Sequence, residues 1–132
     1  MSVFVDTSAF LALLDSHEHN HSLAQHIWLQ LIERDTPLVC TSYVLSETAV
    51  LIQNRLGMQQ IRAFHENVSP FLRVIWVDED LHNMGMTAVL AANRRHLSLV
   101  DCVSFVAMRQ SDLNTTFAFD NHFAEQGFTV LD

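Results

Sequence analysis

Short apolar runs alternate along the chain with longer segments in which apolar residues recur every three or four positions. The short runs are typical of buried strands and span 3–6, 38–41, 72–77, 115–119 and 128–131. The longer segments predict helices over 8–15, 17–34, 43–56, 58–69, 78–94, 99–110 and 121–126. Strands interleaved with helices over the whole length predict an α/β/α sandwich, with a central parallel sheet flanked by helices. We expect a single domain over 1–132.

Four acidic residues fall where this architecture places ligand sites, because parallel sheets bind ligands at the carboxyl ends of their strands. Asp6 and Asp120 end predicted strands. Glu47 and Asp101 lie near the starts of predicted helices. The sequence therefore predicts that four carboxylates meet at one edge of the sheet.

Each of these acids also has a structural interpretation when it is considered alone. Asp6 and Asp120 precede helices and suit the N-cap position, while Glu47 suits a solvated first turn. Four carboxylates gathered among apolar neighbours are costly unless positive charge joins them. Two hard divalent cations would meet that need with oxygen ligands, which favours a metal site.

Composition changes the picture mainly through charge. Fifteen acidic residues oppose seven arginines and no lysine, giving a net charge of -8. A basic surface that tracks phosphates is therefore absent, which disfavours nucleic acid as a ligand. The objection is removed if some of the carboxylates hold divalent cations, because the metals then supply the positive charge.

The remaining sequence features point to a cytoplasmic protein. No apolar run approaches the roughly 18 residues of a membrane span, and no basic region precedes an apolar stretch at the N-terminus. Cys40 and Cys102 each lie in an apolar segment, which predicts buried free thiols. Trp28, Leu31, Trp76 and Phe105 are predicted to be core residues, and the histidines of HEHNH at 17–21 lack the spacing of a helical zinc site.

Four segments in this order resemble the PIN domain family, specifically the small toxin ribonucleases of VapBC-type systems. They are FVDTSAFLALLD at 4–15, TSYVLSETAVLI at 41–52, LSLVDCVSFVAMRQ at 97–110 and FAFDNHFAEQGF at 117–128. The resemblance spans nearly the whole chain. It implies a Mg²⁺- or Mn²⁺-dependent endoribonuclease of single-stranded or structured RNA, a homodimer, and a small antitoxin protein as partner.

The resemblance also assigns roles to residues. It makes Asp6, Glu47, Asp101 and Asp120 both the metal ligands and the catalytic residues of metal-assisted phosphodiester hydrolysis. We expect Asp6 and Asp101 to be the principal ligands, with the other two completing the site directly or through water. Thr7 or Ser8 can contact the scissile phosphate, since they begin a helix whose N-terminus favours anions, although both are equally compatible with simple helix-start positions.

Two departures from the family pattern lie on either side of the fourth acid, Asp120. Many relatives carry Thr or Ser where this chain has Ala118, and some carry another acid where it has His122. The alternative function is a catalytically weak PIN-like module that binds protein or nucleic acid, and a DNA-directed nuclease shares the same chemistry. The arginines that can contact a substrate are Arg55, Arg62, Arg94, Arg95 and Arg109, and the sequence does not rank them.

Overall fold

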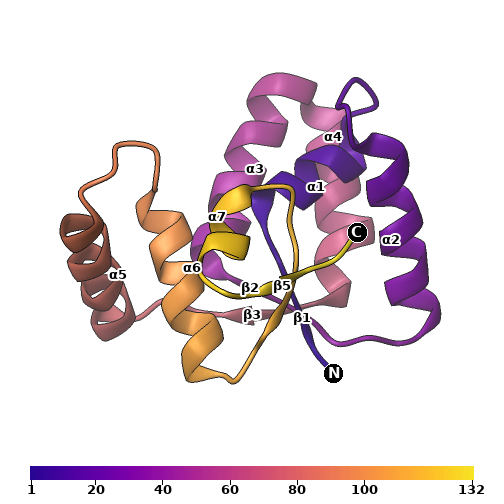
Figure 1. Ribbon diagram of the computed structural model, residues 1–132. Helices are drawn as coiled ribbons and strands as arrows, with labels where there is room; N and C mark the ends of the chain where they lie inside the picture. Colours follow the sequence, from indigo (N-terminus) through magenta and orange to yellow (C-terminus); the bar gives the residue numbers. More distant parts are fainter.

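A five-stranded, fully parallel sheet forms the centre of the protein, which is described over residues 1–132 by a computed structural model (Figure 1). The strands are β1 (Val3–Val5), β2 (Leu38–Thr41), β3 (Leu72–Ile75), β4 (Thr115–Phe117) and β5 (Thr129–Val130). Their spatial order is β3-β2-β1-β4-β5. All five lie within the runs predicted to be strands.

Seven helices cover the two faces of this sheet. They are α1 (Thr7–Leu14), α2 (His21–Glu33), α3 (Ser42–Leu56), α4 (Met58–Ala63), α5 (Glu79–Ala92), α6 (Leu99–Gln110) and α7 (Asn121–Glu125). The chain moves outward from β1 to β3, then returns to β4 on the other side of β1. Because such crossovers are right-handed, α1 to α4 cover one face and α5 to α7 cover the other. Figure 1 shows this division, with α5 and α6 on one side and α1, α2 and α4 on the other.

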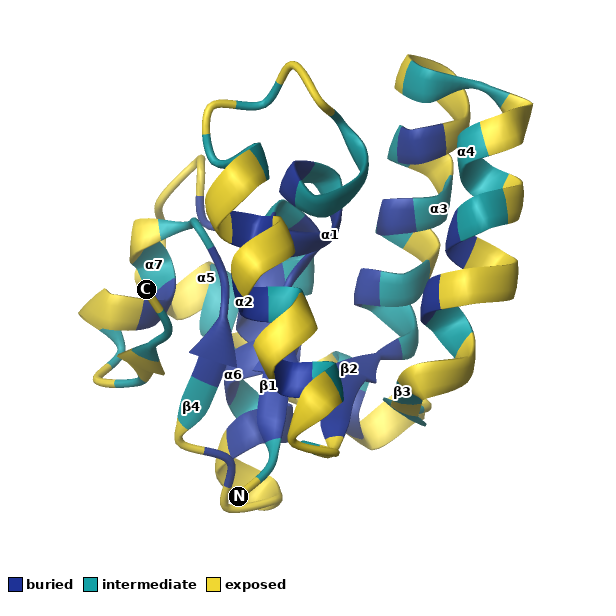
Figure 2. Cartoon of the chain, turned by 90° about the vertical axis from the view of Figure 1, so that its right-hand side faces the viewer, coloured by how far each residue is buried: buried dark blue, intermediate teal, exposed yellow.

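The sheet is apolar on both faces because helices bury both of them. Val3, Phe4 and Val5 are all fully buried, and β1 is dark along its length in Figure 2. On one face of the sheet, the ring of Phe10 on α1 packs edge-to-face against the ring of Phe64, which follows α4. This burial fixes the register of the strand, so the residue that follows β1 is held at a defined place.

Two predictions about local structure were wrong. The predicted helix over 58–69 breaks after Ala63 into a π-helical turn (Phe64–Val68) and a 3₁₀ turn (Ser69–Phe71). Pro70 cannot continue a helix, and the wider turn before it lets both Phe64 and Val68 face the core. Trp76 is not a core residue: it is 73% exposed, because β3 is an edge strand that ends one residue earlier.

Other predictions were confirmed. Cys40 and Cys102 are free and buried. The 99–110 helix has the predicted bounds, and α3 ends at Gly57, whose φ of 90° is a conformation that favours glycine. No helix combines the length and the hydrophobicity that a membrane crossing requires.

Candidate metal centre

Asp6 follows directly after β1 and caps α1. Its Oδ2 accepts hydrogen bonds from the backbone N–H of Ser8 at 3.1 Å and from the Ser8 hydroxyl at 2.6 Å. Asp6 is only 4% exposed, and this burial raises its pKa to about 6. The hydrogen bonds from Ser8 oppose the rise in pKa, whereas the charges of Asp101 and Asp120 add to it. The carboxylate is therefore held in a place that disfavours negative charge.

Asp101 lies in the first turn of α6 and shares a capping box with Ser98. The Ser98 hydroxyl oxygen accepts from the Asp101 N–H at 3.0 Å, and Asp101 Oδ2 accepts from the Ser98 N–H at 3.2 Å. Burial is the main cause that raises the pKa of Asp101, and the charge of Asp120 raises it further. Capping occupies Oδ2, so the second carboxylate oxygen is available for a ligand.

Glu47 projects from the second turn of α3, not from the first turn as one interpretation of the sequence had it. Burial raises the pKa of Glu47, a hydrogen bond with Thr7 lowers it, and the charge of Asp101 raises it again. The Thr7 hydroxyl oxygen also accepts from the Thr48 hydroxyl at 3.1 Å. Thr7 thus links the start of α1 to the acid on α3.

Asp120 caps α7, three residues beyond the end of β4. Its Oδ1 accepts from the backbone N–H of His122 at 2.9 Å. One ligand atom from each of Asp101, Asp120 and His122 lies within 4.8 Å of the other two. This is the tightest group of ligand-type side chains in the protein, and it contains two of the four predicted acids.

The other two acids are coupled to this group by charge. Asp6 interacts with Asp101 and Asp120, and Glu47 interacts with Asp101. Since burial and mutual repulsion raise the pKa values of three of them, ionising the cluster is unfavourable in the free protein, and a bound cation would offset that cost. Oxygen donors at such a site suit Mg²⁺ or Mn²⁺, so the residues present fit a divalent cation.

The Ser8 hydroxyl contacts Asp6, and the Thr7 hydroxyl lowers the pKa of Glu47. Besides bonding Asp6, the Ser8 hydroxyl oxygen accepts from the backbone N–H of Phe119 at 2.9 Å, which ties the segment before Asp120 to α1. Ser8 thus holds the Asp6 carboxylate in place. The contact of Thr7 or Ser8 with a substrate phosphate stays a prediction.

The structure adds His122, which the sequence analysis recorded only as a departure from the family pattern. It lies in the first turn of α7, and its side chain is 17% exposed. In the sequence, His122 could have been found from its position two residues after Asp120, an acid that precedes a short helix. That spacing indicates a ligand only when the fold also brings Asp101 to the same place.

Basic side chains flank one side of this cluster. Arg94 Nη1 donates to Glu125 Oε2 at 2.8 Å, and Glu125 lies on α7 with His122. Arg95 is exposed and lines a surface hollow together with Arg94 and Ser98, the residue that caps α6. Two other arginines of that prediction have partners elsewhere: Arg62 pairs with Glu66, and Arg109 bonds Gln126. Arg95 is thus an exposed cation close to the start of α6.

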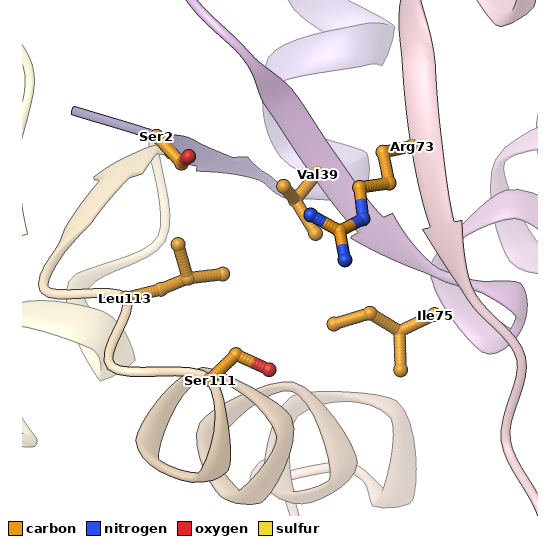
Figure 3. Close-up of a pocket in the computed structure, with 6 residues that line it drawn as sticks. All are labelled: Ser2, Val39, Arg73, Ile75, Ser111 and Leu113. Carbon is orange, nitrogen blue, oxygen red and sulfur yellow. The ribbon is translucent and has the colours of Figure 1, made fainter.

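A second hollow, of about 300 Å³, lies away from the acids (Figure 3). It is lined by Ser2, Val39, Arg73, Ile75, Ser111 and Leu113. Figure 3 shows the Arg73 guanidinium group turned into it. No carboxylate lines it.

Comparison with known proteins gives a consistent result. The family model of the PIN domain matches residues 3–128. The chain is 33% identical over 131 residues to the 23S rRNA-specific endonuclease VapC20 of Mycobacterium tuberculosis, covering 98% of this chain and 97% of the relative.

Two solved structures are similar to this fold. The crystal structure of M. tuberculosis VapC20, a Sarcin-Ricin loop cleaving toxin, superposes with a TM-score of 0.85 at 30% identity, covering 97% of each chain. FitAcB from Neisseria gonorrhoeae has a TM-score of 0.67 at 14% identity, covering 98% of this chain and 96% of its own. The second similarity supports the fold alone.

Proposed function

The chain belongs to the PIN domain family, and from this premise we propose that it is a metal-dependent endoribonuclease, the toxin of a toxin-antitoxin pair. The observation that carries this proposal is the cluster of Asp6, Glu47, Asp101 and Asp120 at the carboxyl edge of the sheet. Burial of carboxylates that repel one another is unfavourable in the free protein, and it becomes favourable when a cation is bound. The proposed location is the cytoplasm.

In the proposed mechanism, the four acids hold one or two divalent cations, with Asp101 at the centre of the group. Bound Mg²⁺ or Mn²⁺ would supply a water of lowered pKa and would offset charge on the phosphate. Ser8 holds the Asp6 carboxylate, and Ser98 holds that of Asp101. Thr7 lowers the pKa of Glu47 and so favours its charged form. These contacts preorganise the carboxylates, so little side-chain freedom is lost when the substrate phosphate arrives.

The alternative function, a PIN-like module with weak or no catalysis, predicts the same fold but no dependence on metal. All four acids are present, and the charge of Asp101 interacts with the charges of the other three. A protein-binding module has no need of such a cluster. The nuclease function is therefore favoured, and a DNA-directed nuclease is tested by offering both polymers.

Excess EDTA is expected to abolish cleavage of a structured RNA, and added Mn²⁺ or Mg²⁺ should restore it. The RNA to test first is 23S rRNA, because the relative VapC20 is named for it and covers almost the whole chain. Primer extension on ribosomes incubated with the protein would locate the cut. Cleavage at full rate in EDTA would remove the metal mechanism.

Arg95→Ala is expected to raise KM for RNA about tenfold and to leave kcat nearly unchanged. Arg95 is exposed beside the residue that caps α6, so its charge suits a phosphate next to the one that is cut. Steady-state kinetics at two salt concentrations measures this, with Arg62→Ala as the matched control. If both variants change KM equally, Arg95 has no special position.

The proposed partners are a second copy of the chain and a small antitoxin protein. Several large apolar side chains are more than half exposed. They lie on α2 to α5, in the turn before β3 and directly after β3: Leu29, Val50, Met58, Phe71, Trp76 and Leu90. Exposed apolar side chains of this size mark protein interfaces when they gather in patches. We expect light scattering to give a mass of about twice 15.0 kDa. A strictly monomeric species at tens of micromolar would contradict the dimer.

A further inference from the structure

We infer that His122 is a nitrogen ligand of the metal centre and that it biases the site towards Mn²⁺ and similar transition metals over Mg²⁺. This inference rests on the proposed metal site and adds to it a donor of a different chemical type. It is carried by the position of the imidazole ring relative to two carboxylates on its two sides.

The first observation is the distance from His122 Nε2 to Asp120 Oδ1, which is 3.7 Å. This separation is too long for a hydrogen bond. Two donor atoms that share one ion, each about 2.1 Å from it, are separated by about 3 to 4 Å. The two atoms are therefore spaced as a pair of ligands is spaced, and Asp101 offers a third atom within 4.8 Å.

The second observation concerns the other ring nitrogen. His122 Nδ1 is shielded from solvent and has no hydrogen-bond partner, and it is the only buried side-chain nitrogen or oxygen in the protein in that state. Glu125 Oε2 lies 3.8 Å from it. A small rotation of the ring would allow Nδ1–H to donate to this carboxylate, which would leave Nε2 unprotonated and free to bind a metal.

The third observation is that Glu125 is itself held in place. Arg94 donates to Glu125 Oε2 at 2.8 Å and keeps the pKa of that carboxyl below its ordinary value, so Glu125 stays ionised. A carboxylate that accepts from the far side of a histidine is the usual support of a metal-binding imidazole. Glu125 is thus a positioning residue for His122, and Arg94 fixes Glu125.

The chemical consequence follows from the donor type. Mg²⁺ prefers oxygen donors, whereas a site with an imidazole nitrogen binds divalent transition metals, with an affinity that rises from Mn²⁺ through Co²⁺ to Ni²⁺. An acid in place of His122 would give an all-oxygen site. The histidine therefore raises affinity for transition metals and adds less negative charge to a cluster in which carboxylates already repel one another.

The test compares metal binding by the full chain and its variants, with Mn²⁺ and Mg²⁺ as the probes. Calorimetric titration of the metal-free protein should give a ratio of Mn²⁺ to Mg²⁺ affinity that is about tenfold or more higher in the wild type than in His122→Asp. Glu125→Ala should weaken Mn²⁺ binding about tenfold. His17→Ala is the matched control, because the His17 side chain is 94% exposed on the loop before α2.

Pulsed EPR of bound Mn²⁺ gives an independent result. A directly bound ¹⁴N should be seen in the wild type, in His17→Ala and in Glu125→Ala, and it should be lost in His122→Ala. Mn²⁺ that binds the wild type without nitrogen coupling, or an affinity ratio equal in wild type and His122→Asp, overturns the inference and leaves the proposed nuclease function standing. If neither ion binds the wild type, both the inference and the proposed function fail.

Discussion

Asp101→Asn is expected to reduce RNA cleavage at least about 100-fold, which corresponds to about 2.7 kcal/mol of transition-state stabilisation. Asp101 is the acid whose charge acts on both Asp6 and Glu47, so its loss weakens the whole proposed centre. The asparagine keeps a side-chain oxygen for the Ser98 N–H, so the capping box can persist. Single-turnover kinetics with excess Mn²⁺ measures the loss.

Thermal unfolding separates this role from helix capping. In EDTA the Asn variant should be as stable as the wild type or more so, because one of the mutually repelling charges is gone. Mn²⁺ at about a hundred times its Kd should stabilise the wild type by ~2.7 kcal/mol, and the variant should lose most of that gain.

Ser98→Ala provides the comparison, because it removes the cap but keeps the carboxylate of Asp101. It should cost about 1 kcal/mol of stability and retain most of the cleavage. The metal-centre assignment fails if Asp101→Asn melts, binds Mn²⁺ and cuts RNA as the wild type does. It also fails if Ser98→Ala is the more damaging change for activity.

The position of the site could be predicted because it depends on a rule about strands. Parallel strands align their carboxyl ends, and the apolar run before Asp6 left little choice about where β1 ends. The helix over 99–110 was equally clear from its recurring apolar residues, and the structure gives it the predicted bounds. These features are local, so the sequence alone was enough to predict them.

The features that were missed depend on tertiary contacts. β4 ends at Phe117, and the following segment is held by the bond from the Phe119 N–H to Ser8, which lies over a hundred residues away in sequence. The same contact places Asp120 and His122 beside Asp101. No periodicity in the sequence reports such a bond. The place of His122 in this group, unlike the location of the acids, therefore required the structure.

The stability of the metal-free protein is expected to fall as the pH rises from about 4 to about 6, and Asp6→Asn should remove much of that fall. The folded-state pKa of Asp6 is about 6, above its ordinary value of 3.8, and burial is the main cause. Below pH 4 the carboxyl is protonated in both states and has no effect. Between the two values the unfolded chain loses the proton first, so folding becomes less favourable.

Above pH 6 the penalty is constant at about 3 kcal/mol, so at pH 7.5 in EDTA Asp6→Asn should melt about 10 °C higher than the wild type. Near pH 4 the two should melt together. Asp78→Asn is the matched control, because Asp78 also caps a helix through its side chain but is exposed and lies outside the cluster.

Saturating Mn²⁺ should reverse the order of the two melting temperatures at pH 7.5, since the wild type gains a bound ion that the Asp6→Asn variant holds poorly. An Asp6→Asn protein whose melting temperature follows that of the wild type from pH 4 to pH 7.5 would show that Asp6 is ionised without penalty, and the need for a cation at this edge would disappear with it.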